Sequence, residues 1–176
     1  MSRDCRIVSL GPGLEPRVPA SAYVDPGARV MGAVSLGERV VVMFGAVLRG
    51  DDDTVTVGDD TVILENTLIE APRGNPVVIG SRVLVSHGAI VHGARVGDGA
   101  LIGIGAIVLD GARVGEQAIV GAGAVVPPGR EIPPRTLALG VPAKPVRQLT
   151  PEELARIEEE LEAVHSKKNR YRQACP

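Results

Sequence analysis

A large aliphatic residue recurs every six positions through most of the chain. In the second half the series is Val96, Ile102, Val108, Val114, Val120 and Val126. A small residue stands four places after each of the first five: Ala100, Ala106, Ala112, Ala118 and Ala124. The same register runs earlier, through residues 24–48, 57–69 and 79–91. This period suits short strands joined by tight corners, with glycine where the backbone needs an unusual φ.

The six-residue period slips in three places. Leu48 and Val57 are nine residues apart, Ile69 and Ile79 are ten apart, and Val91 and Val96 only five. The two longer steps predict bulges near residues 49–53 and 71–76. Extra loops on a solenoid tend to lie on one functional side.

The end of the chain changes to a helical pattern. Thr150-Pro151-Glu152-Glu153 has the features of a capping box with proline at the first helical position. Leu154, Ile157, Leu161 and Val164 then form an apolar stripe at helical spacing. We predict a helix of about 15 residues that packs on the coils or on a neighbouring chain. Three later residues, Lys167, Lys168 and Arg170, are expected to be solvated, and His165 is expected to be exposed.

Composition narrows the class of protein. The 176 residues include 22 Gly, 14 Pro and only three aromatics, so the core must be aliphatic. The net charge of −2 and the lack of a basic run or aromatic platform argue against nucleic-acid binding. No apolar run reaches the roughly 20 residues of a membrane span, and the N-terminus lacks a secretion signal. We expect a soluble, cytoplasmic protein with no membrane partner. Cys5 and Cys175 are expected to be two free thiols, with a disulfide between the ends of the chain as the alternative.

The repeat resembles that of the hexapeptide-repeat family. The resemblance implies an all-β solenoid, a left-handed parallel β-helix with three hexapeptides per coil, followed by a C-terminal α-helix. It also implies a homotrimer. We expect the β-helix domain with its N-terminal lead-in to span residues 1–148, and the C-terminal helix and tail to span 149–176.

Three repeats per coil place residues of successive coils above one another. One predicted corner column contains Arg49, Glu70 and His92, and a second contains Phe44, Glu65 and His87. Five extended residues cover roughly 16 Å, so His87 and His92 of one chain cannot share a metal. A shared metal would need His87 of one chain to meet the Glu70/His92 corner of its neighbour, giving three sites in a threefold trimer.

A second resemblance is more specific than the repeat itself. Four segments are similar to gamma-class carbonic anhydrases: residues 46–51, 86–94, 105–112 and 139–144. That family binds zinc or iron through three histidines at a subunit interface. The resemblance places the second and third metal ligands on His87 and His92, and the first on Glu70. Arg49 and Asp51 match the Arg-Gly-Asp segment, whose arginine is paired across the interface; Glu65 of the neighbouring chain is the expected partner. A polar Gln of the family falls on Leu64.

Two histidines and a glutamate form a known catalytic zinc set, and the same donors suit Fe(II) and other divalent ions. We therefore predict a divalent metal, zinc first with iron or cobalt as alternatives, held by Glu70, His87 and His92. The metal-activated water would hydrate CO₂, giving bicarbonate, or a related small substrate, while Asp51 or Glu65 steers protons. Two alternatives stay open. An inactive trimeric scaffold is favoured by Leu64 and Glu70, and an acyl-CoA-dependent acyltransferase would use His87 or His92 alone.

Overall fold

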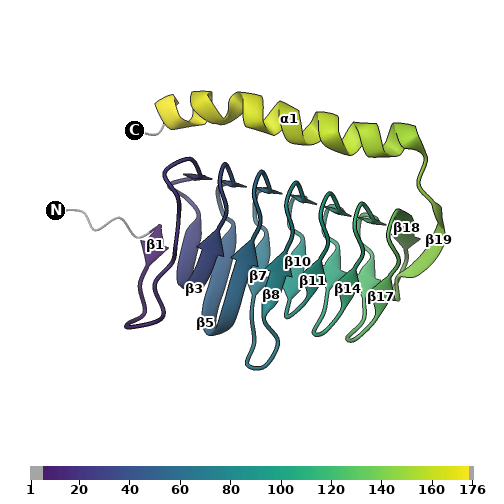
Figure 1. Ribbon diagram of the computed structural model, residues 1–176, viewed down its shortest axis with the longest axis horizontal. Helices are drawn as coiled ribbons and strands as arrows, with labels where there is room; N and C mark the ends of the chain where they lie inside the picture. The colour runs from purple at the N-terminus through teal and green to yellow at the C-terminus, as the bar shows by residue number, and fades with distance from the viewer. Residues whose placement is uncertain (1–5, 175–176) are drawn as a thin grey trace.

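The chain winds into a triangular prism of parallel coils with one long helix along its side (Figure 1). The structure is a computed structural model and describes residues 6–174; Cys5 and Cys175 lie outside that range. The left-handed parallel β-helix with a C-terminal helix is thereby confirmed. No helix in the described part of the chain is long and apolar enough to cross a membrane.

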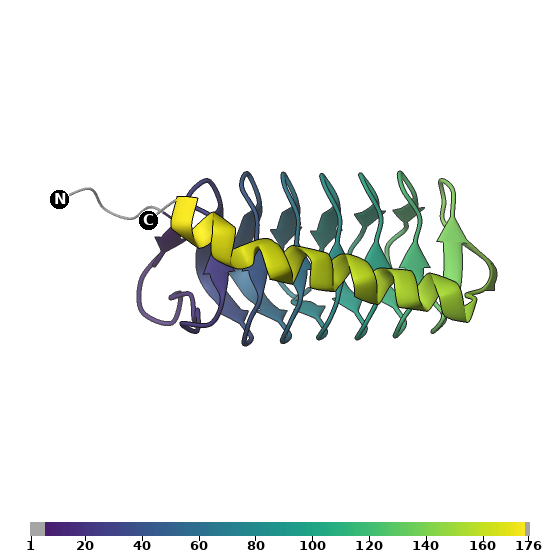
Figure 2. The ribbon, with the colours of Figure 1, turned by 90° about the horizontal axis from the view of Figure 1, so that it is seen from above.

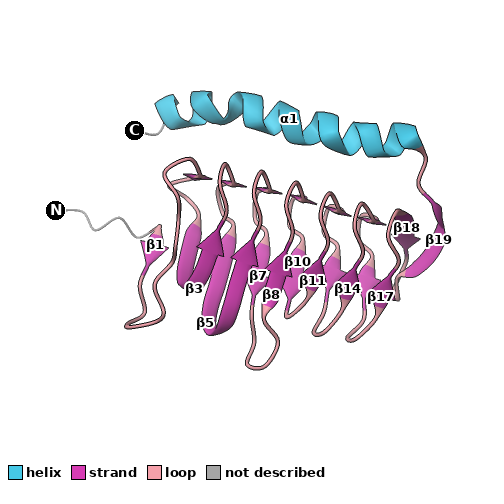
Figure 3. Cartoon of the chain, in the orientation of Figure 1, coloured by secondary structure: helices cyan, strands magenta, loops and turns pink. Residues whose placement is uncertain are grey.

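Short strands form the three faces of the prism (Figure 3). The helix-covered face consists of β2 (Tyr23–Val24), β4 (Val41–Val42), β6 (Val62–Ile63), β9 (Leu84–Val85), β12 (Leu101–Ile102), β15 (Ile119–Val120) and β18 (Thr136–Leu139). The aliphatic face contains β1 (Ile7–Val8), β7 (Leu68–Glu70), β10 (Ile90–His92), β13 (Ile107–Val108) and β16 (Val125–Val126). The polar face contains β8 (Val77–Ile79), β11 (Arg95–Val96), β14 (Arg113–Val114) and β17 (Glu131–Ile132). Two long strands, β3 (Arg29–Leu36) and β5 (Val47–Val57), turn the corner between the aliphatic and polar faces, and β19 (Lys144–Gln148) pairs antiparallel with β18.

The inward side chains form aliphatic ladders, as the six-residue period predicts. On the aliphatic face Val30, Leu48, Ile69, Val91, Val108 and Val126 are hydrogen-bonded neighbours in register and fully buried. The small residues, among them Ala46, Ala89 and Ala106, are fully buried with them. A prism this narrow has little space for rings, which accounts for the scarcity of aromatic residues.

Both predicted insertions lie at the corner between the aliphatic and polar faces. The pairing passes from Gly32–Gly50 to Val34–Val55, so one residue of β3 stands opposite four of β5. The extra residues are therefore a bulge within an extended strand. The second insertion, residues 71–76, is the loop between β7 and β8. Gly74 N donates to Asp53 Oδ2, which ties the two insertions together.

The three faces differ in what their outward side chains meet. On the helix-covered face the outward residues Val41, Val62 and Leu84 are buried beneath the helix. On the polar face the outward row is Ser35, Thr56, Val78, Arg95, Arg113 and Glu131. On the aliphatic face it is Val47, Leu68, Ile90, Ile107 and Val125, all partly exposed. One aliphatic row is thus covered within the chain, and the other is not.

The C-terminal helix α1 (Pro151–Ala174) begins where predicted, but it has 24 residues rather than about 15. Its capping box is present: Thr150 N donates to Glu153 Oε2 at 3.0 Å, and Glu153 N donates to Thr150 Oγ1 at 3.3 Å. The helix runs back along the whole prism to the first coils (Figure 2). Its far end is held there because Tyr171 stacks on Tyr23 with ring centroids 6.2 Å apart.

Two expectations for the end of the helix are wrong. His165 is partly buried and its Nε2 donates to the carbonyl of Asp60 at 2.9 Å. Lys168 is also partly buried, with Nζ 3.4 Å from the Ser21 carbonyl, and burial lowers the pKa of its ammonium group. His165 lies at the end of the predicted length and Lys168 beyond it, and both still contact the prism.

Leu161 tests the packing of the helix on the prism. Its side chain is 1% exposed within a cluster that includes Val41, Met43 and Val62. Leu161→Ala should lower the free energy of unfolding by about 2–5 kcal/mol in urea denaturation, because it leaves a cavity. The exposed neighbour Glu160→Ala should change it by less than about 0.5 kcal/mol. Equal effects of the two substitutions would contradict this packing.

Glu153 makes the start of the helix sensitive to acid. Hydrogen bonds from Arg147 and from the Thr150 backbone lower the pKa of Glu153 from 4.5 to about 2. Because the folded-state pKa is depressed, this stabilisation is complete above pH 4.5 and is lost as the pH falls towards 2. Carboxyl NMR titration should give a low pKa in the wild type and a higher one in Arg147→Gln. A wild-type pKa near 4.5 would refute the contact.

Candidate functional site

The predicted columns are present at two different corners of the prism. Arg49 is the strand partner of Glu70, and Glu70 is the partner of His92. At the second corner Asn66 N donates to the Phe44 carbonyl and Gly88 N donates to the Glu65 carbonyl, so Phe44, Glu65 and His87 stand above one another. The parallel, in-register pairing of successive coils produces these columns, because residues that follow equivalent strand positions come to lie directly above one another.

The first corner contains a chain of charges. Arg49 donates to Glu70 through Nη2, and its Nε lies 3.0 Å from Asp51 Oδ1. His92 Nε2 lies 3.9 Å from the same Glu70 oxygen. Glu70 therefore stands between a guanidinium and an imidazole, and both of its neighbours come from adjacent coils. The ion pair with Arg49 is the competitor that metal binding by Glu70 must displace or share.

Each histidine turns its Nδ1 towards a carboxylate from a neighbouring coil. His92 Nδ1 and Asp110 Oδ1 form a 2.5 Å hydrogen bond. His87 Nδ1 lies 2.6 Å from Glu65 Oε2, without hydrogen-bond geometry. In both residues Nε2 is the nitrogen left for another partner. Metal-binding histidines commonly have this arrangement, with the second ring nitrogen on a carboxylate.

Asp110 is the site residue that the sequence did not single out. Its segment is part of the family resemblance, but the coil register pairs Val91 with Val108 and thus puts Leu109, not Asp110, above His92. The short five-residue step between Val91 and Val96 brings the next acidic residue within reach. That step was visible in the sequence, although its consequence for Asp110 was not.

Two buried polar atoms in the described part of the chain have no hydrogen bond: Arg49 Nε and Glu65 Oε2. The first is a donor and the second an acceptor, and they belong to different corners. Each nevertheless lies close to a partner group of its own chain: Arg49 Nε is 3.0 Å from Asp51 Oδ1, and Glu65 Oε2 is 2.6 Å from His87 Nδ1.

A complete metal-ligand set does not form within one chain. No group of three His, Cys, Asp or Glu side chains among residues 6–174 converges closely enough to hold a metal ion. Glu70 and His92 face one another at one corner, while His87, 52% exposed in its side chain, is at the other. The donor types fit a divalent metal, and a third donor for Glu70 and His92 would have to come from a second chain.

Leu64 has a packing role. It is partly buried against the cluster between the helix-covered face and α1, which includes Tyr23, Val41, Leu84 and Ile157. It therefore extends the contact between the helix-covered face and α1, directly beside Glu65. An apolar side chain is favourable at this position because it adds to that contact.

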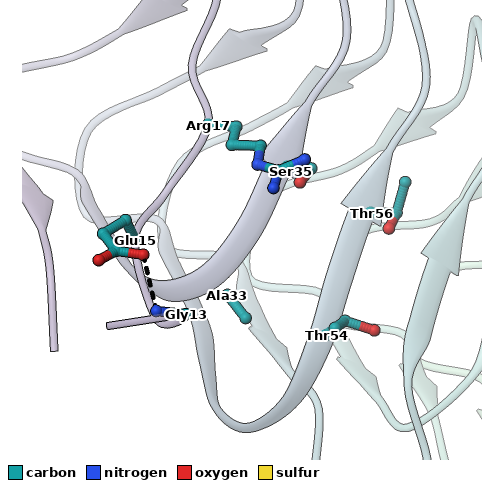
Figure 4. Close-up of a pocket in the computed structure, with 7 residues that line it drawn as sticks. All are labelled: Gly13, Glu15, Arg17, Ala33, Ser35, Thr54 and Thr56. Atoms are coloured by element: carbon teal, nitrogen blue, oxygen red, sulfur yellow. Dashed lines mark hydrogen bonds between the residues drawn. The ribbon is translucent and has the colours of Figure 1, made fainter. Parts of the chain in front are cut away.

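A polar pocket of about 330 Å³ lies elsewhere, at the first coils (Figure 4). Its lining residues are Gly13, Glu15, Arg17, Ala33, Ser35, Thr54 and Thr56. None of the six predicted site residues contributes to it. The pocket is thus separate from both histidine corners.

Comparison with known proteins agrees with the repeat. Residues 93–128 match the family model described as bacterial transferase hexapeptide (six repeats). The chain is 46% identical over 142 residues to a probable carbonic anhydrase from Methanocaldococcus jannaschii, covering 81% of this chain and 89% of the relative. It is 40% identical over 146 residues to the mitochondrial gamma carbonic anhydrase 1 of Arabidopsis thaliana, covering 80% of this chain and about half of the relative (53%).

A solved structure has the same fold over nearly the whole chain. The crystal structure of a hexapeptide transferase family protein from Anaplasma phagocytophilum superposes with a TM-score of 0.89 at 32% identity, covering 95% of this chain and 98% of that one. The sequence identity to the carbonic anhydrases and this structural likeness lead to the same conclusion. The chain belongs to the gamma-class carbonic anhydrase-like family of hexapeptide-repeat proteins.

Proposed function

We propose that the chain is a homotrimeric, divalent-metal-dependent enzyme that hydrates CO₂ to bicarbonate at sites between chains. Each site would combine Glu70 and His92 of one chain with His87 of the next. The relatives named as carbonic anhydrases support the reaction. The observation that supports the shared site is the divided donor set: Glu70 and His92 face one another at one corner, His87 lies at the other, and among residues 6–174 no three donors converge.

The uncovered aliphatic row supports the same assembly. Val47, Leu68, Ile90, Ile107 and Val125 lie between the two histidine corners, where a neighbouring chain would bury them. Phe44 and Ile104, 52% and 59% exposed, belong to the His87 corner itself. Large exposed apolar side chains in one continuous strip are typical of protein interfaces.

The donor set suits zinc, with Fe(II) or Co(II) as alternatives, because two imidazoles and one carboxylate leave a position open. A bound metal supplies the Lewis acidity that makes water a nucleophile near neutral pH. His87 and His92 present Nε2 and Glu70 presents a carboxylate oxygen. Arg49 holds Glu70 and Asp51 in place, and Asp51 and Glu65 are the carboxylates available to accept a proton at the edge of the site.

A catalytically inactive trimeric scaffold is the second candidate. The Arg49–Glu70 ion pair and the packing of Leu64 favour it, because both stabilise the prism without a metal. The same interface would form in either case. Metal content and CO₂ hydration therefore separate the two candidates, and the oligomeric state does not.

Mixed trimers test the shared site. The wild-type protein should retain about one metal per chain after loading with Zn²⁺, and it should hydrate CO₂ in a stopped-flow assay. His87→Ala and His92→Ala should each lose metal and activity. When the two variants are refolded together, about one interface in four should combine an intact His87 with an intact His92 and recover both.

The outcomes distinguish the alternatives. A wild-type protein that binds no metal would refute the metal-dependent enzyme and favour the inactive scaffold. Stoichiometric metal without CO₂ hydration would refute the proposed substrate. Two single variants that retain metal, or mixed trimers that recover none, would refute the site between chains.

Ile90 tests the interface. Ile90→Glu puts a charge in the centre of the aliphatic row and should shift the mass in light scattering from trimer towards monomer, because a charge buried without a partner is costly. Arg95→Glu, on the polar face, should leave the mass unchanged. Loss of the trimer in both variants or in neither would show that the aliphatic face is not the interface.

A further inference from the structure

We propose that Asp110 is the positioning residue of His92, and that Gly93 is a glycine because the Asp110 carboxylate must pass through the space of its missing side chain. The role assigned to this contact, which is to orient His92 Nε2 towards a metal, rests on the proposed function. Its geometry rests on three residues of one chain and needs no partner.

The contact between Asp110 and His92 fixes which ring nitrogen is protonated. Asp110 Oδ1 lies 2.5 Å from His92 Nδ1 with hydrogen-bond geometry. An ionised carboxylate can only accept, so Nδ1 carries the hydrogen and the lone pair of the neutral ring is on Nε2. Nε2 is also the nitrogen that faces Glu70, at 3.9 Å. The tautomer and the ring orientation both suit a ligand shared with Glu70.

Gly93 makes this contact possible. Its φ is +57°, and a Cβ built on it would lie 2.6 Å from Asp110 Oδ1 and 2.8 Å from Asn75 Cβ. Real Cβ atoms do not come so close to their neighbours. Any other residue at this position would push the carboxylate away from His92. The corner is also one residue shorter than its counterparts, which brings the coil of Asp110 directly onto it: Gly111 N donates to the Gly93 carbonyl at 2.7 Å.

A purely stabilising ion pair is the competing explanation. Asp110 is 43% exposed and His92 30% exposed in their side chains, so solvent weakens their attraction and the pair contributes little to folding. The second corner offers a contrast: Glu65 approaches His87 Nδ1 at 2.6 Å without hydrogen-bond geometry, and its Oε2 stays without a hydrogen bond among the described residues. Of the two corner histidines, His92 is the one hydrogen-bonded to a carboxylate among residues 6–174.

The first test needs no metal. In ¹⁵N NMR of the metal-free trimer at pH 8, the His92 ring should be protonated on Nδ1. Asp110→Ala should lose this preference, and Asp110→Asn should keep most of it, because the amide oxygen still accepts the hydrogen bond. A wild-type His92 protonated on Nε2, or an Asp110→Ala ring identical to the wild type, would overturn the inference.

The second test measures Zn²⁺ affinity by competition with a chelating dye, with the trimer mass checked for each variant. Asp110→Ala and Gly93→Ala should each weaken binding by about 10–100-fold. Gly129→Ala is the matched control: this glycine has φ +65° at the same corner, and a Cβ there would meet nothing within 4 Å. It introduces the same left-handed strain and should bind Zn²⁺ as the wild type does.

The two proposals fail differently. A wild type that binds no Zn²⁺ refutes the proposed function, while the NMR result still decides whether Asp110 sets the His92 tautomer. A wild type that binds Zn²⁺, with Asp110→Ala and Gly93→Ala binding equally well, refutes the positioning role and leaves the metal site intact. Equal weakening in Gly93→Ala and Gly129→Ala would assign the effect to backbone strain alone and would overturn the role of Gly93.

Discussion

The hydrogen-bonded register between successive coils determines where every candidate functional side chain lies. A coil cannot slip by one residue without turning its aliphatic ladder outward, because inward and outward positions alternate along each strand. The buried ladder from Val30 to Val126 therefore holds the register of the whole aliphatic face. Arg49, Glu70 and His92 each follow a ladder residue directly, so their alignment at one corner is a consequence of core packing.

The same register gives each face of the prism a different outward row of side chains. The outward rows on two faces are aliphatic, and α1 covers only one of them. Polar side chains occupy the third row. The uncovered row lies between His87 and His92, so a chain packed against it would bring together the two corners that a single prism keeps apart. In the proposed function, assembly and metal binding are one requirement, because the candidate ligands of a single chain are divided between two corners.

Much of this arrangement could be predicted from the sequence, because the six-residue period indicates directly which residues of successive coils pair. Counting three hexapeptides per coil placed both columns correctly, and the phase slips located both insertions. The length of α1 could not be read from its apolar stripe, since its last turns are held by Tyr171 on Tyr23 and by polar contacts of His165 and Lys168 that have no periodic signature. The contact of Asp110 with His92 could not be predicted either. It depends on a shortened corner and on the empty space at Gly93, and the six-residue period indicates neither the packing of that corner nor the direction of the Asp110 side chain.

Anomalous diffraction from crystals of the Co²⁺-loaded protein tests the central claim most directly, because it locates the metal and its ligands together. The account predicts one peak per chain between neighbouring prisms, about 2.0–2.2 Å from His92 Nε2, a Glu70 oxygen and Nε2 of the partner's His87. Peaks absent from this position in a metal-loaded trimer, with Glu70 still paired only to Arg49, would contradict it.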